Sequence, residues 1–264
     1  MHPFDEDLSL ARIGPALYRG KITGNWSING IPNGGYLIAL MAHAMLQESE
    51  KKTPLVVTAN YFHRSLIGDA DLALENIAVS KSFDRWQAKL SQEGRERIRA
   101  TGTFVDDRGE PGKGEYEKSA PEIPEPEACI PMPTIPNFTL LDRIDVRLDP
   151  ACAGWLEGKP ADRSEQRGWV RFHEDRPQDM LSALIIADSF PPPVLASHGM
   201  FAWVPTIELS VNVRNRPRTE WLKCIFRTSF INNGILEEDG EVWDADGELV
   251  AISRQIAQFR KPAG

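Results

Sequence analysis

The residue best suited to chemistry in this sequence is Asp188, a carboxylate at the end of an apolar run. Residues 180–187 are almost entirely apolar, and three prolines follow at 191–193. A carboxylate is costly to bury unless it is paired, and the C-terminal end of a helix disfavours negative charge. Functional carboxylates often occupy such unfavourable places, so Asp188 is a candidate functional residue. The alternative is that it faces solvent or caps the proline turn.

A second candidate is Gln255, in a segment with the alternation of a β-strand. Strict alternation over residues 249–259 puts Gln255 and Ser253 on a face whose other members are small or apolar. A glutamine among such neighbours needs hydrogen-bond partners. A buried water and a carboxylate would supply them, whereas an edge-strand glutamine would reach solvent instead. Thr206, in residues 203–215, is on its own an ordinary strand residue.

The residues Asn33, Gly34, Gly35 and Tyr36 form the third candidate, at the start of an apolar stretch. Glycine lets backbone approach a ligand closely, and free N–H groups at the start of a helix can bind an oxyanion. The alternative is a tight loop in which Asn33 caps the helix. The two interpretations are compatible.

These residues must be positioned by a repeated set of elements. Residues 36–46 are apolar on nearly every side, which indicates a buried helix. Four strand-like segments follow, and the order of strand, apolar helix and four strands returns about 150 residues later. A duplicated fold is the simplest explanation. We expect the two halves to form one continuous antiparallel sheet around the helices, because each half alone would leave a sheet edge unpaired.

Between the halves lies a segment rich in proline and acidic residues, which predicts a linker. The expected organisation is an N-terminal unit over residues 1–108, a linker over 109–165 and a C-terminal unit over 166–264.

The composition of the chain limits the partners and metal sites that we expect. The 264 residues are 41% hydrophobic and 26% charged with a net charge of −8, which gives no reason to expect nucleic acid or a membrane as partner. The three cysteines, an odd number without metal-ligand spacing, predict reduced thiols, no metal site and a cytoplasmic location. The N-terminal segment lacks the features of a secretory signal. No G-x-S-x-G motif of an α/β-hydrolase is present.

Three motifs resemble one family. "NGIPNGGYLIAL", "PTIELSVNVRNRP" and "WDADGELVAISRQIAQFR" are similar to the thioesterase-like superfamily of double hotdog proteins, with the type II acyl-CoA thioesterases as nearest characterised relatives. The resemblance covers about residues 15–260. It implies an α+β double hotdog fold, in which two tandem hotdog repeats form a long curved antiparallel sheet around two central apolar helices.

The resemblance also implies an activity, the hydrolysis of acyl-CoA to a free acid and coenzyme A by a bound water. The family's water-holding Asp, Thr and Gln match Asp188, Thr206 and Gln255. We expect the N–H groups of Gly34 and Gly35 to stabilise the oxyanion, Asn33 and Tyr36 to contribute to substrate binding, and the acyl tail to lie near Trp26, Tyr36, Phe62 and Trp203. The triple proline departs from the family pattern and predicts that Asp188 lies near a helix end.

Two other functions stay open: a protein that binds acyl thioesters or lipids without turnover, and an enoyl-thioester hydratase or dehydratase. The hydratase interpretation is weakened because its usual paired Asp and His motif is not visible. A β-barrel unrelated to thioesters is disfavoured by the two apolar helices. We expect acyl-CoA or a related thioester as partner, no cofactor beyond the coenzyme A of the substrate, and a homo-oligomer.

Overall fold

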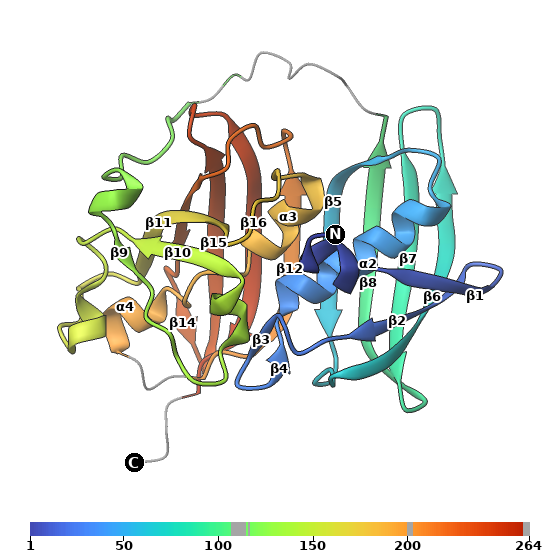
Figure 1. The fold of residues 1–264 in the computed structure, drawn as a ribbon, viewed down its shortest axis with the longest axis horizontal. Helices are drawn as coiled ribbons and strands as arrows, with labels where there is room; N and C mark the ends of the chain where they lie inside the picture. The colour runs from blue at the N-terminus through green and yellow to red at the C-terminus, as the bar shows by residue number, and fades with distance from the viewer. Residues whose placement is uncertain (107–114, 116, 200–202, 261–264) are drawn as a thin grey trace.

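The chain folds into a curved antiparallel sheet that holds two helices on its concave side (Figure 1). The computed structural model describes residues 1–106, 115, 117–199 and 203–260. Within these residues one 14-stranded sheet runs in the order β1-β2-β6-β7-β8-β5-β12-β16-β15-β13-β11-β10-β9, with β14 paired to β15. The six strands from β1 to β5 mirror the six from β12 to β10, so the sheet consists of two equivalent halves. This confirms the predicted double hotdog architecture.

The first half contains the predicted helix and the four predicted strands after it. Its elements are α1 (Pro3–Asp7), β1 (Leu10–Gly14), β2 (Leu17–Ile22), β3 (Ser27–Ile28), β4 (Ile31–Pro32), α2 (Gly34–Glu48), β5 (Thr53–Tyr61), β6 (Gly68–Val79), β7 (Asp84–Gln92) and β8 (Arg95–Val105). The second half repeats this order. Its elements are β11 (Glu165–Phe172), α3 (Met180–Ile186), α4 (Val194–His198), β12 (Thr206–Val213), β13 (Leu222–Arg227), β14 (Ile231–Asn232), β15 (Ile235–Asp244) and β16 (Leu249–Gln258).

The two halves are joined along β5 and β12, which pair antiparallel from Glu208 opposite Asn60 to Asn212 opposite Val56. A side-chain hydrogen bond of 2.8 Å between Thr58 Oγ1 and Ser210 Oγ crosses this seam. The seam uses the strand edges that each half alone would leave unpaired. One continuous sheet is the result, as the sequence predicted.

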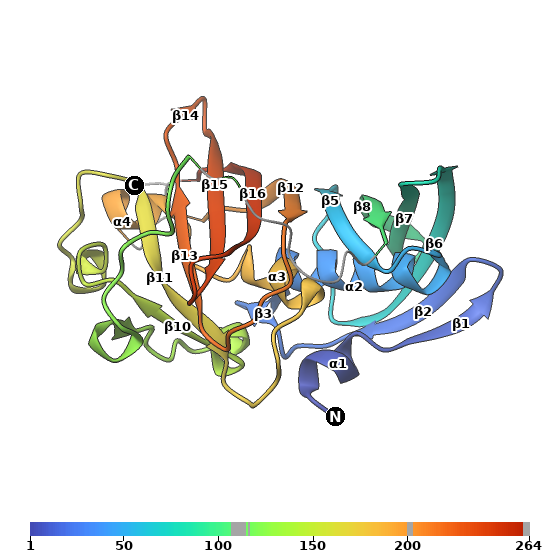
Figure 2. The same ribbon diagram turned by 90° about the horizontal axis from the view of Figure 1, so that it is seen from above.

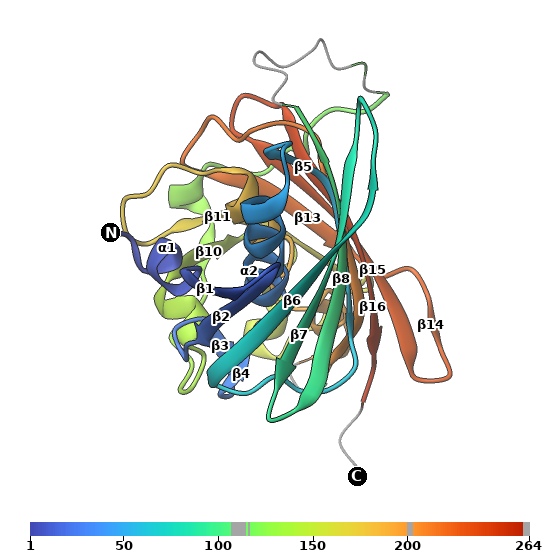
Figure 3. The same ribbon diagram turned by 90° about the vertical axis from the view of Figure 1, so that its right-hand side faces the viewer.

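Helix α2 is apolar all round because it is enclosed. Ten of its fifteen residues are buried, and it packs against β5, β6, β7, β8 and α3. Figures 2 and 3 show α2 and α3 in one layer, with the main sheet on one side and the strand pairs β1–β2 and β10–β11 curling round toward the other. The core therefore runs through both halves, and the ends of the two helices meet near the middle of the molecule.

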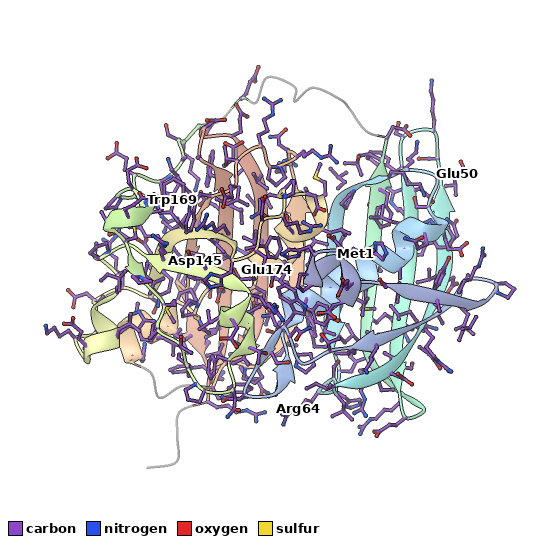
Figure 4. All side chains as sticks on the ribbon, viewed as in Figure 1. Met1, Glu50, Arg64, Asp145, Trp169 and Glu174 are labelled. Carbon is purple, nitrogen blue, oxygen red and sulfur yellow. The ribbon has the colours of Figure 1, made fainter. Side chains whose placement is uncertain are left out.

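The prediction that residues 109–165 form a linker is wrong over much of that segment. Residues 126–148 contain two strands that extend the second half of the sheet, and β10 pairs with β11 in the register Val146 opposite Val170. Figure 4 labels Asp145 on β10 and Trp169 on β11 in this region. The prolines obscured the alternation of Ile144, Val146 and Leu148, which are all buried. The elements are η1 (Pro126–Ala128), β9 (Ile130–Pro131), η2 (Thr139–Asp142), β10 (Ile144–Leu148) and η3 (Gly154–Glu157).

Residues 109–114 and 116 of the predicted linker lie outside the described residues. Within the described part of the chain, no helix combines the length and hydropathy required to cross a bilayer. The three cysteines Cys129, Cys152 and Cys224 are free and buried.

Candidate functional site

Asp188 lies two residues beyond the end of α3, where the chain turns before the prolines. Its backbone N–H donates to the carbonyl of Ile185 at 3.1 Å, a tightened last turn that often ends a helix. The location near a helix end agrees with the prediction from the triple proline. Helix α3 starts with a capping box in which the Asp179 side chain accepts from Ser182 N–H and the Ser182 hydroxyl accepts from Asp179 N–H.

The carboxylate of Asp188 lies against the start of the other helix, α2. Asp188 Oδ2 accepts a hydrogen bond of 2.8 Å from Gly35 N–H and one of 3.0 Å from Asn33 Nδ2. Asn33 Nδ2 also donates to the Asp188 carbonyl at 2.8 Å. The sequence predicted an unfavourable place at the C-terminal end of α3. The place is unfavourable overall, as the raised pKa of the carboxyl group shows, but the positive N-terminal end of α2 offsets part of the cost of the negative charge.

Burial and hydrogen bonding act on the pKa of Asp188 in opposite directions. Removal from water is the larger effect and raises the pKa to about 6, although hydrogen bonds from Gly35, Asn33 and Gly34 favour the carboxylate. The group is therefore ionised at neutral pH, yet basic enough to accept a proton there. A general base is most effective when its pKa lies near the working pH.

Gly34 and Gly35 permit close contact between two segments of the protein. A Cβ on Gly35 would lie 2.8 Å from the Ile185 carbonyl oxygen, and one on Gly34 would lie 2.9 Å from Asp188 Oδ2 and 3.1 Å from Tyr61 Oη. The missing side chains make room for Asp188. Because Gly35 N–H donates to Asp188, the expectation that it is free for an oxyanion is corrected. Asn33 is the predicted cap of α2, since its Oδ1 accepts from Tyr36 N–H at 3.0 Å.

Tyr36 belongs to the core. Its side chain is fully buried, stacks on the Trp26 ring at 6.2 Å between centroids, and donates its hydroxyl to the Asp7 carbonyl at 3.0 Å. Trp26 is fully buried as well and donates Nε1–H to Asp7 Oδ2 at 2.7 Å. Both aromatic residues are fully buried in the core, so neither exposes surface to a substrate in this structure, and their role in substrate binding stays a prediction. Phe62 and Trp203 are exposed.

Thr206 and Gln255 are brought together by neighbouring strands. Gln255 Nε2 donates to Thr206 Oγ1 at 2.9 Å, across the β12–β16 pair. Gln255 lies on the buried face of β16, with only 4% of its surface exposed, as alternation predicted. Leu209 pairs with Gln255 and Thr206 with Ala257, so a bulge at Ile207 turns both Thr206 and Leu209 inward. Bulges of this kind often re-aim side chains beside a functional site.

Thr206 and Gln255 can each form a further hydrogen bond. Thr206 accepts from Gln255, and its own hydroxyl hydrogen is free to be donated. Gln255 Oε1 is buried and has no hydrogen-bond partner among the residues that the structure describes. A hydroxyl donor and an amide acceptor therefore face the interior with unused hydrogen-bonding capacity.

Glu238 lies opposite Gln255 and feels the charge of Asp188, and sequence reasoning missed it. It lies on β15 directly opposite Gln255, and 6% of its surface is exposed. Burial raises its pKa well above the usual range, and the negative charge of Asp188 raises it further. The sequence does contain a signal for Glu238, because alternation places it with Leu236, Gly240 and Val242 on one face of the strand, and Glu238 is the only charged member of that set.

Tyr61 is a second residue that the sequence did not reveal. Its hydroxyl donates to the Gly34 carbonyl at 2.7 Å, and burial together with the charge of Asp188 raises its pKa well above the usual value. Tyr61 thus lies on the far side of the Gly34–Gly35 turn and supports it. Its position at the end of a strand carries no sequence signal for this role.

The charge on Asp188 gives a testable consequence for stability. Because its pKa in the folded state lies above the unfolded value of 3.8, the folded protein loses stability as pH rises from about 4 to about 6. We expect Asp188→Asn to be more stable than the wild type by up to about 3 kcal/mol above this window, and equal to it below the window. Thermal unfolding at a series of pH values measures the difference, and a difference that does not change with pH would contradict the ionised, enclosed carboxylate.

Among the described residues, no group of three or more His, Cys, Asp or Glu side chains is arranged to hold a metal ion. What the arrangement can do is acid–base chemistry. It offers an ionised carboxylate at a helix N-terminus, and a hydroxyl and an amide on strands β12 and β16. Helix α3, which precedes Asp188, packs against β12, so both parts lie at the same junction of the two halves.

Comparison with known proteins gives matches over both halves of the chain. Residues 126–259 match a family model described as the acyl-CoA thioesterase C-terminal domain, and residues 22–105 match the acyl-CoA thioesterase N-terminal domain. The boundary at residue 126 agrees with the start of the extra strands in the second half. An uncharacterized protein of Mycobacterium tuberculosis (strain H37Rv) is 24% identical over 286 residues, covering 97% of this chain and 95% of its own length.

Solved structures share the fold over nearly the whole chain. A crystal structure of a candidate thioesterase II from Thermobifida fusca superposes with a TM-score of 0.89 and 26% identity, covering 99% of this chain and 98% of that one. A hot dog protein of unknown function from Alicyclobacillus acidocaldarius also gives 0.89, at 21% identity and full coverage of both chains. For the acyl-CoA thioesterase II TesB2 of Mycobacterium marinum the TM-score is 0.77 at 17% identity, with 99% of each chain covered.

Proposed function

From the premise that this chain belongs to the acyl-CoA thioesterase family, we propose that it hydrolyses the thioester bond of acyl-coenzyme A by means of a water activated at Asp188. One observation carries this proposal. The Asp188 carboxylate is held by Gly35 N–H and Asn33 Nδ2, and its pKa of about 6 suits a base at neutral pH.

In the proposed reaction Asp188 accepts a proton from the water as the water oxygen attacks the acyl carbonyl carbon. The tetrahedral intermediate then collapses, the carbon–sulfur bond breaks, and coenzyme A leaves as a thiolate. The proton on Asp188 passes to the thiolate or to solvent. A thiolate needs little acid assistance to leave, because thiols ionise near pH 8.5.

Thr206 and Gln255 would hold the water. The Thr206 hydroxyl, fixed by Gln255 Nε2, keeps a hydrogen to donate, and Gln255 Oε1 keeps an acceptor position. Asn33 and the two glycines hold the base in place. Such positioning contributes to rate because a base and a nucleophile that are already oriented do not have to find each other.

The proposal is tested by incubating the purified protein with acyl-CoA esters of increasing chain length and following release of free thiol with a thiol-reactive dye. We expect turnover, with kcat/KM rising as pH increases and levelling above about pH 6, as Asp188 ionises. Binding of the esters without thiol release would instead favour the binding protein. Conversion of an enoyl-CoA to its hydrated product would favour the hydratase.

The remaining expectations from the sequence are part of the same proposal. The reaction would need no cofactor and no metal, so chelators would leave the rate unchanged. The protein would act in the cytoplasm as a homo-oligomer. Size-exclusion chromatography with light scattering measures the assembly.

A further inference from the structure

Glu238 is a buried acid directly beside the proposed water-holding pair. Strands β15 and β16 are antiparallel, and Glu238 lies opposite Gln255. Both side chains are buried, with 6% and 4% of their surfaces exposed, so both point to the inner face of the sheet. Directly opposite residues have Cβ atoms about 4.5–5.5 Å apart, which places the carboxyl group within reach of the Gln255 amide.

The charges around Glu238 are negative. Asp188, at the end of α3, and Asp239, the next residue on β15, are the charged groups that act on it. Asp239 points to the outer face and pairs with Arg254 at 2.6 Å. No hydrogen bond or ion pair joins the Glu238 carboxyl to any residue that the structure describes. Burying a carboxylate without a partner is costly, and such groups become neutral instead.

A neutral carboxyl group has a hydrogen to donate. A buried acceptor without a donor lies on the directly opposite residue, Gln255, whose Oε1 has no partner among the described residues. Leaving such an atom unpaired destabilises the arrangement that contains it. One hydrogen bond would pair the carboxyl group and the amide oxygen at once.

We propose that Glu238 is protonated at neutral pH and donates a hydrogen bond to Gln255 Oε1, which fixes the orientation in which Gln255 Nε2 holds Thr206. Glu238 is thus a positioning residue that acts through Gln255. The inference rests on the proposed hydrolysis for its kinetic consequence, but its protonation can be measured without turnover. Asp188 and Glu238 then form a pair in which the first carboxyl is ionised and the second is neutral.

Two substitutions of Glu238 distinguish a positioning role from a role in proton transfer. Glu238→Gln keeps a neutral group that donates to Gln255 Oε1, whereas Glu238→Leu removes the donor. Glu237→Gln is the matched control, because Glu237 precedes Glu238 on β15, points to the opposite face and accepts hydrogen bonds from Ser229 and Phe230 N–H. A glutamine at position 237 can still accept these bonds.

We expect the kcat of the wild type to fall at alkaline pH as Glu238 ionises. For Glu238→Gln we expect a kcat within about threefold of the wild type at neutral pH. This variant should not show the alkaline decline, because glutamine does not ionise. Glu238→Leu lowers kcat about tenfold or more with little change in KM. A large loss in Glu238→Gln would overturn positioning in favour of proton transfer. An unchanged alkaline decline in that variant, or full kcat in Glu238→Leu, would overturn the proposal as well.

Infrared spectroscopy near pH 8 tests the protonation independently. The wild type and Glu237→Gln should show the carbonyl band of a protonated carboxyl group that Glu238→Gln lacks. Asp188 does not contribute there, because it is ionised well above pH 6. Identical spectra for the wild type and Glu238→Gln would overturn the proposal. If the wild type hydrolyses no thioester, the proposed function fails, while this spectrum still decides whether Glu238 carries the proton.

Discussion

Asp188→Asn is expected to lower kcat/KM for acyl-CoA hydrolysis by about 10²- to 10⁴-fold, the usual contribution of a general base. Asparagine has nearly the same shape, and its Oδ1 can still accept from Gly35 N–H and Asn33 Nδ2, which now donate to the carboxylate. The loss should therefore be in kcat, with KM little changed, because the amide cannot accept the proton of the water. Thiol release from acyl-CoA measures both constants.

Asp239→Asn is the matched control. It removes a carboxylate of the same type from β15, but that carboxylate lies on the outer face in an ion pair with Arg254, and it acts on Glu238 only through its charge. We expect its kinetics to match the wild type. If Asp188→Asn retained full activity, or if Asp239→Asn lost as much, Asp188 would not be the base.

Stability and activity should move in opposite directions in Asp188→Asn. At neutral pH the wild type bears the cost of an ionised, enclosed carboxylate, and the variant does not. A variant that is inactive and at the same time more stable has not lost activity by unfolding. Functional sites often keep a group that lowers the stability of the fold, as the ionised Asp188 does here.

Much of the fold could be predicted from the sequence because it depends on local periodicity. Residues 36–46 lack a polar face, and a helix of that kind must be enclosed. The alternation around Gln255 assigned that side chain to the inner face of its strand, which is the buried face of β16. The repeated order of elements predicted two equivalent halves, and the need to pair sheet edges predicted one continuous sheet, although not that β5 and β12 form the seam.

Other features could not be predicted, because they depend on contacts between distant segments or on departures from regular geometry. Strands β9 and β10 form despite the prolines around them, since β10 pairs with β11 on one side and with β9 on the other, and local sequence does not reveal these partners. The bulge at Ile207 breaks the alternation that would have turned Thr206 and Leu209 to opposite faces. The donors to Asp188 come from residues more than 150 positions away, so the residues around Asp188 carry no sign of a favourable helix dipole.

The contact between the start of α2 and the backbone after α3 requires a glycine at position 35. Gly35 allows the start of α2 to touch the backbone after α3, and the start of α2 supplies the donor that holds Asp188. An alanine Cβ there would lie 2.8 Å from the Ile185 carbonyl oxygen, 3.0 Å from Ile185 Cα and 2.9 Å from Asp188 Cβ. These are backbone atoms or atoms next to the backbone, so no rotamer change relieves the clash.

Gly35→Ala is therefore expected to push the two segments apart. We expect it to lower the free energy of unfolding by about 1–3 kcal/mol, the usual cost of overpacking a filled core. It should also lower kcat about 100-fold, because displacing a catalytic group by about 1 Å has an effect of that size. Urea unfolding measures the first quantity, and thiol release under conditions in which the variant is folded measures the second.

Gly14→Ala is the comparison that separates crowding from the substitution itself. A Cβ on Gly14 would lie 3.5 Å from the Leu17 side chain, an ordinary contact, so stability and kcat should be close to those of the wild type. Alanine is otherwise preferred to glycine within a helix by roughly 0.5–1 kcal/mol, so an uncrowded Gly35→Ala would be neutral or stabilising. If Gly35→Ala kept wild-type stability and activity, the position of Asp188 would not depend on the close approach of the two helices.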